Sequence, residues 1–245
     1  MIKQEKITKG IVIRAIDWGE KDKIITVFTL DYGKISLKLR GVRSPKSIMK
    51  FASFPLAYIE FTFVGNGDIL TCTQANEVAN FFDLSLDYDK LSYASAVLEV
   101  LDSITIDNVR DSRLFYTAVN TLFYMCKSDI PILLIFAKFL SSILYIMGVM
   151  AELNVCKSCG NNFSNGARLN LDSGEIVCLA CPSTPSSVLL SPIMLAELSL
   201  LHTFTFDNLH KLRLNHLPRI LDVLLQNIQF RLGKRLKSIK FQKKF

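Results

Sequence analysis

Four cysteines in two pairs constrain this chain more than any other feature. Cys156-Lys-Ser-Cys159 and Cys178-Leu-Ala-Cys181 are two C-x-x-C turns separated by the 18 residues 160–177. Two thiolates three positions apart can bind one metal ion from a tight turn, and two such turns complete a tetrahedron with sulfur–zinc bonds of about 2.3 Å. The sequence therefore predicts a zinc ion bound by all four cysteines. Four thiolates leave no open coordination position, so we expect a structural role.

The surroundings of the cysteines favour zinc over the two alternatives, a pair of disulfides and a dithiol redox pair. Arg168–Val177 is typical of a short hairpin, with a turn signal at Asp172-Ser173-Gly174. A redox C-x-x-C would not need a second copy at this distance. Met1–Lys9 is polar and lacks an apolar secretory core. We therefore expect a cytoplasmic, reducing location, where thiols bind metal more often than they oxidise.

Charge points to an acidic partner. The chain has 245 residues, enough for one large or two modest domains, and a formal net charge of +7. Two stretches contain basic residues and no acid: Lys34–Lys50, with six, and Arg231–Phe245, with seven. One such run is often only a solvated face, but two favour binding to a polyanion, either nucleic acid or an anionic membrane.

A membrane span is the weaker interpretation. Ile130–Met150 is strongly apolar, but Lys138 falls inside it. A lysine near the centre of a lone span costs about 3 kcal/mol. We expect a buried helix in a helical domain instead. The two remaining cysteines, Cys72 and Cys126, are expected to be small buried apolar residues.

The first eighty residues are rich in strand signals. Ile35, Leu37 and Leu39 alternate with Ser36, Lys38 and Arg40, so the cations should lie on the face away from the core. Five short strands suit a closed barrel of the OB type, and an SH3-like barrel is the competing interpretation. The predicted strands are Gly10–Trp18, Asp22–Leu30, Ile35–Val42, Pro55–Val64 and Asp68–Gln74.

Helical spacing takes over after about residue 87. Ser191-Pro192 is an N-cap signal with proline at the first helical position. The predicted helices are Tyr88–Ser103, Asp111–Lys127, Ile130–Met150, Pro192–His202 and Leu217–Leu232. The predicted fold class is therefore α+β: an N-terminal OB barrel over residues 1–80, then a helical domain over 81–245 that contains a zinc module at 156–181.

Catalytic motifs are missing from the sequence. It has no phosphate-binding G-x-x-x-x-G-K-[ST] loop, no G-x-G-x-x-G and no G-x-S-x-G. The spacing of His202, His210 and His216 fits no zinc protease motif. The sequence therefore favours a binding protein over an enzyme.

The chain resembles the RecO family of bacterial recombination mediators, most strongly in residues 10–47 and at the four paired cysteines. The family's pattern is matched in order by Gly10-Ile-Val-Ile-Arg14, Trp18-Gly-Glu-Lys-Asp22, Phe28–Lys34, Arg40-Gly-Val-Arg43 and Lys46-Ser47. The C-terminal Leu236-Lys-Ser238 resembles its closing segment, and the cysteines match a zinc-containing subfamily. The resemblance implies a nucleoid-associated protein that binds single- and double-stranded DNA and anneals complementary strands. It further implies work with RecR and the acidic tail of single-strand binding protein, help in loading RecA, and no membrane partner.

Two sets of cations are candidate DNA contacts. Trp18 and Tyr58 are candidate stacking surfaces beside the first set, although Trp18 fits a barrel core equally well. The first set is Lys34, Lys38, Arg40, Arg43, Lys46 and Lys50; the possible second patch is Arg231, Lys234, Arg235, Lys237 and Lys240. The rival functions are a zinc-ribbon RNA-binding protein of ribosome or tRNA metabolism and a peripheral membrane protein.

Overall fold

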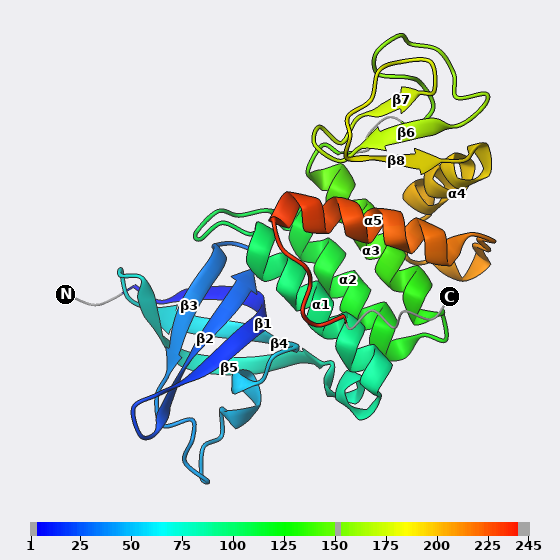
Figure 1. Cartoon of the computed structure of the whole chain (residues 1–245). Coiled ribbons are helices and arrows are strands. Elements are labelled where there is room, and N and C mark those ends of the chain that lie inside the picture. Colours follow the sequence, from blue (N-terminus) through cyan, green and yellow to red (C-terminus); the bar gives the residue numbers. More distant parts are fainter. Residues whose placement is uncertain (1–3, 150–152, 240–245) are drawn as a thin grey trace. The chain divides into compact units, whose positions relative to one another are not determined.

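The computed structural model describes residues 4–149 and 153–239 and contains two compact units (Figure 1). The first unit comprises the chain up to Cys126 together with the segment from Ser238 onward. The second unit is Lys127–Lys237. The C-terminal segment therefore belongs to the same unit as the N-terminal barrel, which a linear division of the sequence does not indicate.

A closed barrel of five strands forms the start of the first unit. The strands are β1 (Lys6–Trp18), β2 (Asp22–Thr29), β3 (Gly33–Leu39), β4 (Ala57–Val64) and β5 (Ile69–Asn80). They follow the order β1-β2-β3-β5-β4, with β1 paired antiparallel to β4 and β3 paired parallel to β5. This five-stranded barrel confirms the prediction of an OB-like fold.

The barrel core follows from the two-residue alternation along the strands. In β3, Ile35, Leu37 and Leu39 are buried, while the residues between them are partly exposed. Val27, Phe61 and Phe63 fill the same core from β2 and β4. The strand β5 runs six residues beyond the predicted end at Gln74, because the polar segment up to Asn80 still pairs with β4. Pairing with a neighbour outweighs the low strand propensity of asparagine and glutamate there.

Two helices complete the first unit. A 3-10 turn, η2 (Phe82–Leu86), leads into α1 (Tyr88–Ile104), and α2 (Ser112–Lys127) follows. Asp87 caps α1 by accepting a hydrogen bond from the Lys90 backbone N–H at 3.0 Å. Phe115 of α2 packs on the outer face of the barrel, with its ring centre 5.8 Å from that of Phe28. Part of the barrel exterior is therefore covered and cannot meet solvent.

The second unit combines three helices with a small sheet. The helices are α3 (Ile132–Ile146), α4 (Pro192–Thr203) and α5 (Leu217–Leu232), and a 3-10 turn η3 (Leu209–Lys211) precedes α5. The strands β6 (Ala167–Asn170), β7 (Ile176–Cys178) and β8 (Ser187–Leu190) pair in the order β7-β6-β8. The β6–β7 pair is the hairpin predicted over Arg168–Val177. The strand β8 was not predicted, because its four residues follow a Pro/Ser-rich connector and carry no alternation of their own.

The apolar helix α3 is a core helix, as predicted. Lys138 is 7% exposed, and its ammonium donates to the carbonyls of Leu201 at 3.1 Å and His202 at 2.9 Å. These carbonyls end α4, where a cation is favourable. Among the described residues, no helix has both the length and the apolar character to cross a membrane.

The two isolated cysteines differ from each other. Cys72 is buried, as expected, and burial raises the pKa of its thiol to about 12. Cys126 is only half-buried, because it lies near the end of α2. The expected burial therefore holds for Cys72 and is wrong in degree for Cys126.

Candidate metal site and nucleic-acid interface

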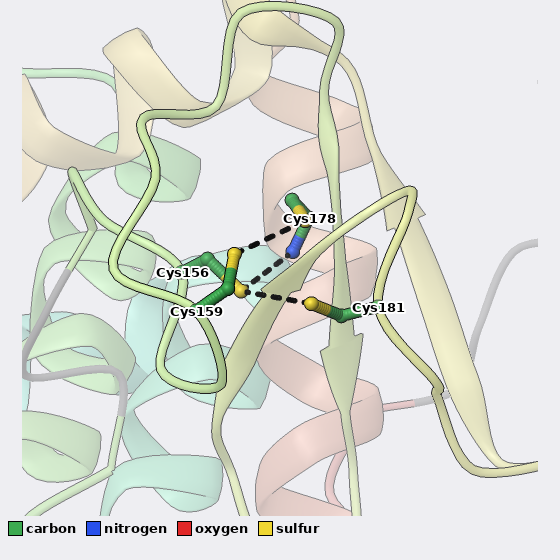
Figure 2. A group of neighbouring side chains, drawn as sticks. All are labelled: Cys156, Cys159, Cys178 and Cys181. Carbon is green, nitrogen blue, oxygen red and sulfur yellow. Dashed lines mark hydrogen bonds between the residues drawn. The ribbon is translucent and has the colours of Figure 1, made fainter.

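The four paired cysteines converge on one point (Figure 2). Their sulfur atoms all lie within 4.8 Å of one another, and the pairs Cys156–Cys181 and Cys159–Cys178 are each separated by 3.8 Å. A regular tetrahedron with sulfur–zinc bonds of about 2.3 Å has edges of about 3.8 Å. A disulfide would instead need about 2.05 Å between sulfurs. The cluster therefore has the dimensions of a structural metal site.

Backbone contacts hold the cysteine turns in place. The Cys178 N–H donates to the Cys156 sulfur at 3.2 Å, and the Gly160 N–H donates to the Cys156 carbonyl at 2.8 Å. Gly160 has a φ of +74°, a left-handed conformation that closes the first turn at no steric cost. The Lys157 N–H donates to the Ile176 carbonyl at 3.0 Å and joins this turn to β7. The hairpin thus positions the second cysteine pair against the first.

The pKa values of the cysteine thiols are also consistent with a metal-binding role for the cluster. Burial raises the pKa of Cys156, but backbone N–H groups outweigh it and hold that pKa at about 6. The pKa of Cys181 is raised to about 12, because its thiol is hydrogen-bonded among the other sulfurs. Four thiolates this close repel one another, so a bound cation is what would allow all four to deprotonate.

The predicted cations of the barrel occupy three different environments. Lys38 and Arg43 are in ion pairs at the surface: Lys38 with Asp22 at 3.0 Å, and Arg43 with Asp17 at 3.2 Å. The pKa of Asp22 is lowered, first by the Gly41 N–H that donates to it at 2.8 Å and then by Lys38. The run Lys34–Lys50 contains no acid in sequence, but β1 and β2 bring carboxylates to it.

Three cations of the set are free of such pairing. Arg40, Lys46 and Lys50 are exposed, and within the described chain no ion pair engages them. Arg40 follows the end of β3, and the other two lie in the connection from β3 to β4. This connection contains η1 (Lys50–Ser53). These three side chains are therefore the ones whose charge is fully available to a polyanion.

Lys34 lies apart from the other five. Its side chain is 16% exposed, and its ammonium donates to the Asp102 carbonyl at 2.9 Å. The carboxylates of Asp102 and Asp107 each lie 3.6 Å from the same nitrogen. Lys34 thus ties β3 to α1 and to the segment that follows it, and its charge is neutralised within the unit.

Of the two candidate aromatics, Trp18 is the exposed one, at 49%. In the pairing of β1 with β2, Trp18 lies opposite Asp22 and Ile16 lies opposite Ile24. In the pairing of β2 with β3, Ile24 lies opposite Lys38. Register partners point to the same side of a sheet, so the exposed Ile16 and Trp18 share a face with Lys38. We call these three residues the outer face of the β1–β3 sheet.

Tyr58, in contrast, packs against α2, with its ring centre 6.1 Å from that of Phe115. Burial raises the pKa of its hydroxyl. This position is unlike that of Trp18, since part of the ring is already covered by the helix. A strand signal alone could not distinguish the two, because α2 was not placed on the barrel by the sequence.

The candidate C-terminal patch is also divided. Arg231 is half-buried in the second unit, donates to the Asn227 amide oxygen at 2.9 Å, and lies where a Cβ on Gly174 would have to be. Lys234, Arg235 and Lys237 are exposed, whereas Lys240 lies outside the described residues. In the first unit, Ser238 is held by the Glu99 carboxylate, which accepts from its N–H at 3.0 Å and from its hydroxyl at 2.9 Å.

Comparison with known proteins identifies the family. A model described as the N terminal of recombination protein O matches residues 1–81, and one described as its C terminal matches residues 85–240. The chain belongs to the recombination protein O family. The resemblance to this family is thereby confirmed, and the second match covers the helices between the barrel and the cysteines, where the sequence offered no motif.

Curated relatives agree with this assignment, and each of the following is named DNA repair protein RecO. That of Alkaliphilus metalliredigens is 29% identical over 209 residues, which cover 85% of both chains. That of Acetivibrio thermocellus is 30% identical over 174 residues, 71% of this chain and 69% of the relative. That of Halalkalibacterium halodurans is 35% identical over 151 residues, 62% of this chain and 59% of the relative.

Proposed function

We propose that this chain is a DNA repair and homologous recombination mediator that binds single- and double-stranded DNA and anneals complementary strands. In this proposal it acts in the cytoplasm with RecR and the acidic tail of single-strand binding protein, and helps RecA load. Family membership and the DNA repair names of the relatives support this role. Positioning and annealing strands requires no covalent chemistry. The role is therefore compatible with a sequence that lacks nucleotide-binding and hydrolase motifs.

The outer face of the β1–β3 sheet is the observation that carries the proposal. It combines the exposed Trp18 indole with the Lys38 ammonium on an OB-like barrel, and such barrels bind strands through stacking and phosphate contacts. We assign DNA contact to residues 1–80, and to Arg40, Lys46 and Lys50 first. Lys38 and Arg43 follow, because a phosphate must compete with their carboxylate partners. Lys34 is left out because its partners lie inside the unit.

We further propose that the metal bound by Cys156, Cys159, Cys178 and Cys181 is one structural zinc ion per chain. All-sulfur tetrahedral coordination of these dimensions suits zinc. When bound, the ion would supply folding energy to the module at 156–181 and would leave no position for a substrate.

The test of function compares the full chain with Trp18→Ala by fluorescence anisotropy on single-stranded DNA, duplex DNA and RNA of one length. Loss of one stacking contact should weaken single-strand binding by about 1–3 kcal/mol. Ile7→Ala is the matched control, because Ile7 is an exposed apolar residue at the far end of β1. If the parent preferred RNA, or if Trp18→Ala bound all three ligands as tightly as the parent, the proposed DNA role of this face would be wrong.

A further inference from the structure

A cavity opens on the other side of the β1–β2 hairpin from Trp18. Asp17 and Lys23 are register partners, and neighbouring residues in a strand point to opposite sides. These two side chains therefore face away from the outer face and toward the connection between β3 and β4. The cavity between them has a volume of about 260 Å³ and is lined by Asp17, Lys23, Val42, Arg43, Lys50, Ser53 and Phe54.

The lining combines two buried small side chains with one aromatic ring and basic residues. Val42 and Ser53 are almost completely buried. Phe54 is 48% exposed, and the Lys23 ammonium lies 5.8 Å from its ring centre. Lys50 is exposed and, within the described chain, has no ion-pair partner. The cavity thus offers a ring for stacking and a free cation at one edge.

Arg43 holds the two walls of the cavity together. Its guanidinium pairs with Asp17 at 3.2 Å and donates to the Gly19 carbonyl at 3.1 Å. Its backbone N–H donates to the Lys21 carbonyl at 2.9 Å. These contacts fix the β1–β2 turn against the segment after β3. The cavity is therefore formed before any ligand arrives, which lowers the entropic cost of binding.

The chemistry of the lining distinguishes between ligands. Inside the cavity, Arg43 and Lys23 are already paired with the Asp17 carboxylate at 3.2 Å and 3.9 Å, so Lys50 at the edge is the lining cation that remains available to a phosphate. A flat uncharged ring can stack on Phe54, and its N–H groups can donate to that carboxylate. A phosphate joined to such a ring would lie outside, at Lys50. One nucleotide supplies all three groups: a ring that stacks on Phe54, an N–H that donates to Asp17, and a phosphate at Lys50.

Resting on the DNA-binding role proposed above, we infer that this cavity takes one unpaired base of single-stranded DNA, stacked on Phe54, with the adjacent phosphate at Lys50. A base in a duplex is paired and stacked, and must be flipped out before it can enter. The cavity therefore favours single strands over duplex, whereas the cations of the barrel attract both. The strand would pass around the β1–β2 hairpin from its outer face to this side.

The test uses the full chain and four proteins: the parent, Phe54→Ala, Phe54→Tyr and Phe82→Ala. Phe82 is an exposed phenylalanine in η2 and serves as the matched control. Thermal unfolding first confirms that all four are folded. Anisotropy should then show Phe54→Ala binding single strands about 5- to 150-fold more weakly, the range expected for one stacked base, with duplex binding unchanged. Phe54→Tyr and Phe82→Ala should match the parent.

A second measurement replaces the bases rather than the protein. A single strand carrying one abasic site in every few nucleotides keeps its phosphates and loses stacking partners. The parent should bind it more weakly than the intact strand, and the difference between the two strands should be smaller for Phe54→Ala, which keeps only the stacking contact proposed for Trp18. Equal losses of single-strand and duplex affinity in Phe54→Ala, no loss on either, or tight binding of the abasic strand by the parent would each refute base insertion. A parent that binds neither DNA form would instead refute the proposed function itself.

Discussion

Replacing Lys34 should destabilise the protein without weakening its contact with DNA, the opposite of what its place in a basic run indicates. In Lys34→Met the side chain keeps its length but loses a charged hydrogen bond to the Asp102 carbonyl and two ion pairs. A hydrogen bond from a charged group contributes about 1.5–3 kcal/mol when largely buried. Asp107 is 76% exposed, so its pair adds little. The expected loss in free energy of unfolding is about 2–3 kcal/mol.

Urea denaturation followed by circular dichroism measures this loss, and anisotropy on single-stranded DNA measures binding under conditions where the variant is folded. Lys50→Met is the matched control, since Lys50 is exposed and free of ion pairs in the described chain. It should lose affinity and keep its stability within about 0.5 kcal/mol. If Lys34→Met were as stable as the parent but bound DNA about tenfold more weakly, the structural role of Lys34 would be refuted.

Three further outcomes are expected. Elemental analysis should find about one zinc ion per chain in protein purified without chelators, and Cys178→Ser should lose both the metal and the local stability of its module. Neutralising the three unpaired cations to Gln should reduce the slope of log affinity against log salt on single strands by about 2, at about 0.7 per phosphate contact; an unchanged slope would place the contacts elsewhere. These cations are Arg40, Lys46 and Lys50. Burial lowers the pKa of Lys138 from 10.5 to about 8, so the folded state carries a penalty of about 3 kcal/mol below pH 8 that disappears as the pH rises to about 10.5. The stability of the parent relative to Lys138→Met should therefore increase over that interval in urea denaturation, and a flat difference would contradict the burial of a charged lysine.

Patterns that repeat along the chain predicted most of the fold. The alternation of Ile35, Leu37 and Leu39 sets which side of β3 faces the core, and the bounds of α5 follow its helical spacing and Gly233, which ends it in a left-handed conformation. The metal site was predictable because its four ligands lie in two C-x-x-C turns, one before the β6–β7 hairpin and one that begins at its last residue. The strand β8 and the extension of β5 were not predictable. They depend on a partner strand and not on their own residues.

The six basic residues of Lys34–Lys50 show what a sequence pattern could not predict. From their charge and spacing in the sequence, these six cations cannot be divided into paired and unpaired ones. In the folded unit, Asp22 of β2 pairs with Lys38, Asp17 of β1 pairs with Arg43, and Lys34 is held by α1 and the segment after it. Each of these acids comes from a different part of the chain, so long-range packing decides which cations remain for a polyanion. The same packing gives Arg43 a second role, because its guanidinium pairs with Asp17 and donates to the Gly19 carbonyl of the β1–β2 turn. A basic run that looks like one binding surface in the sequence therefore contains unpaired cations, surface ion pairs and one lysine, Lys34, that stabilises the packing inside its unit.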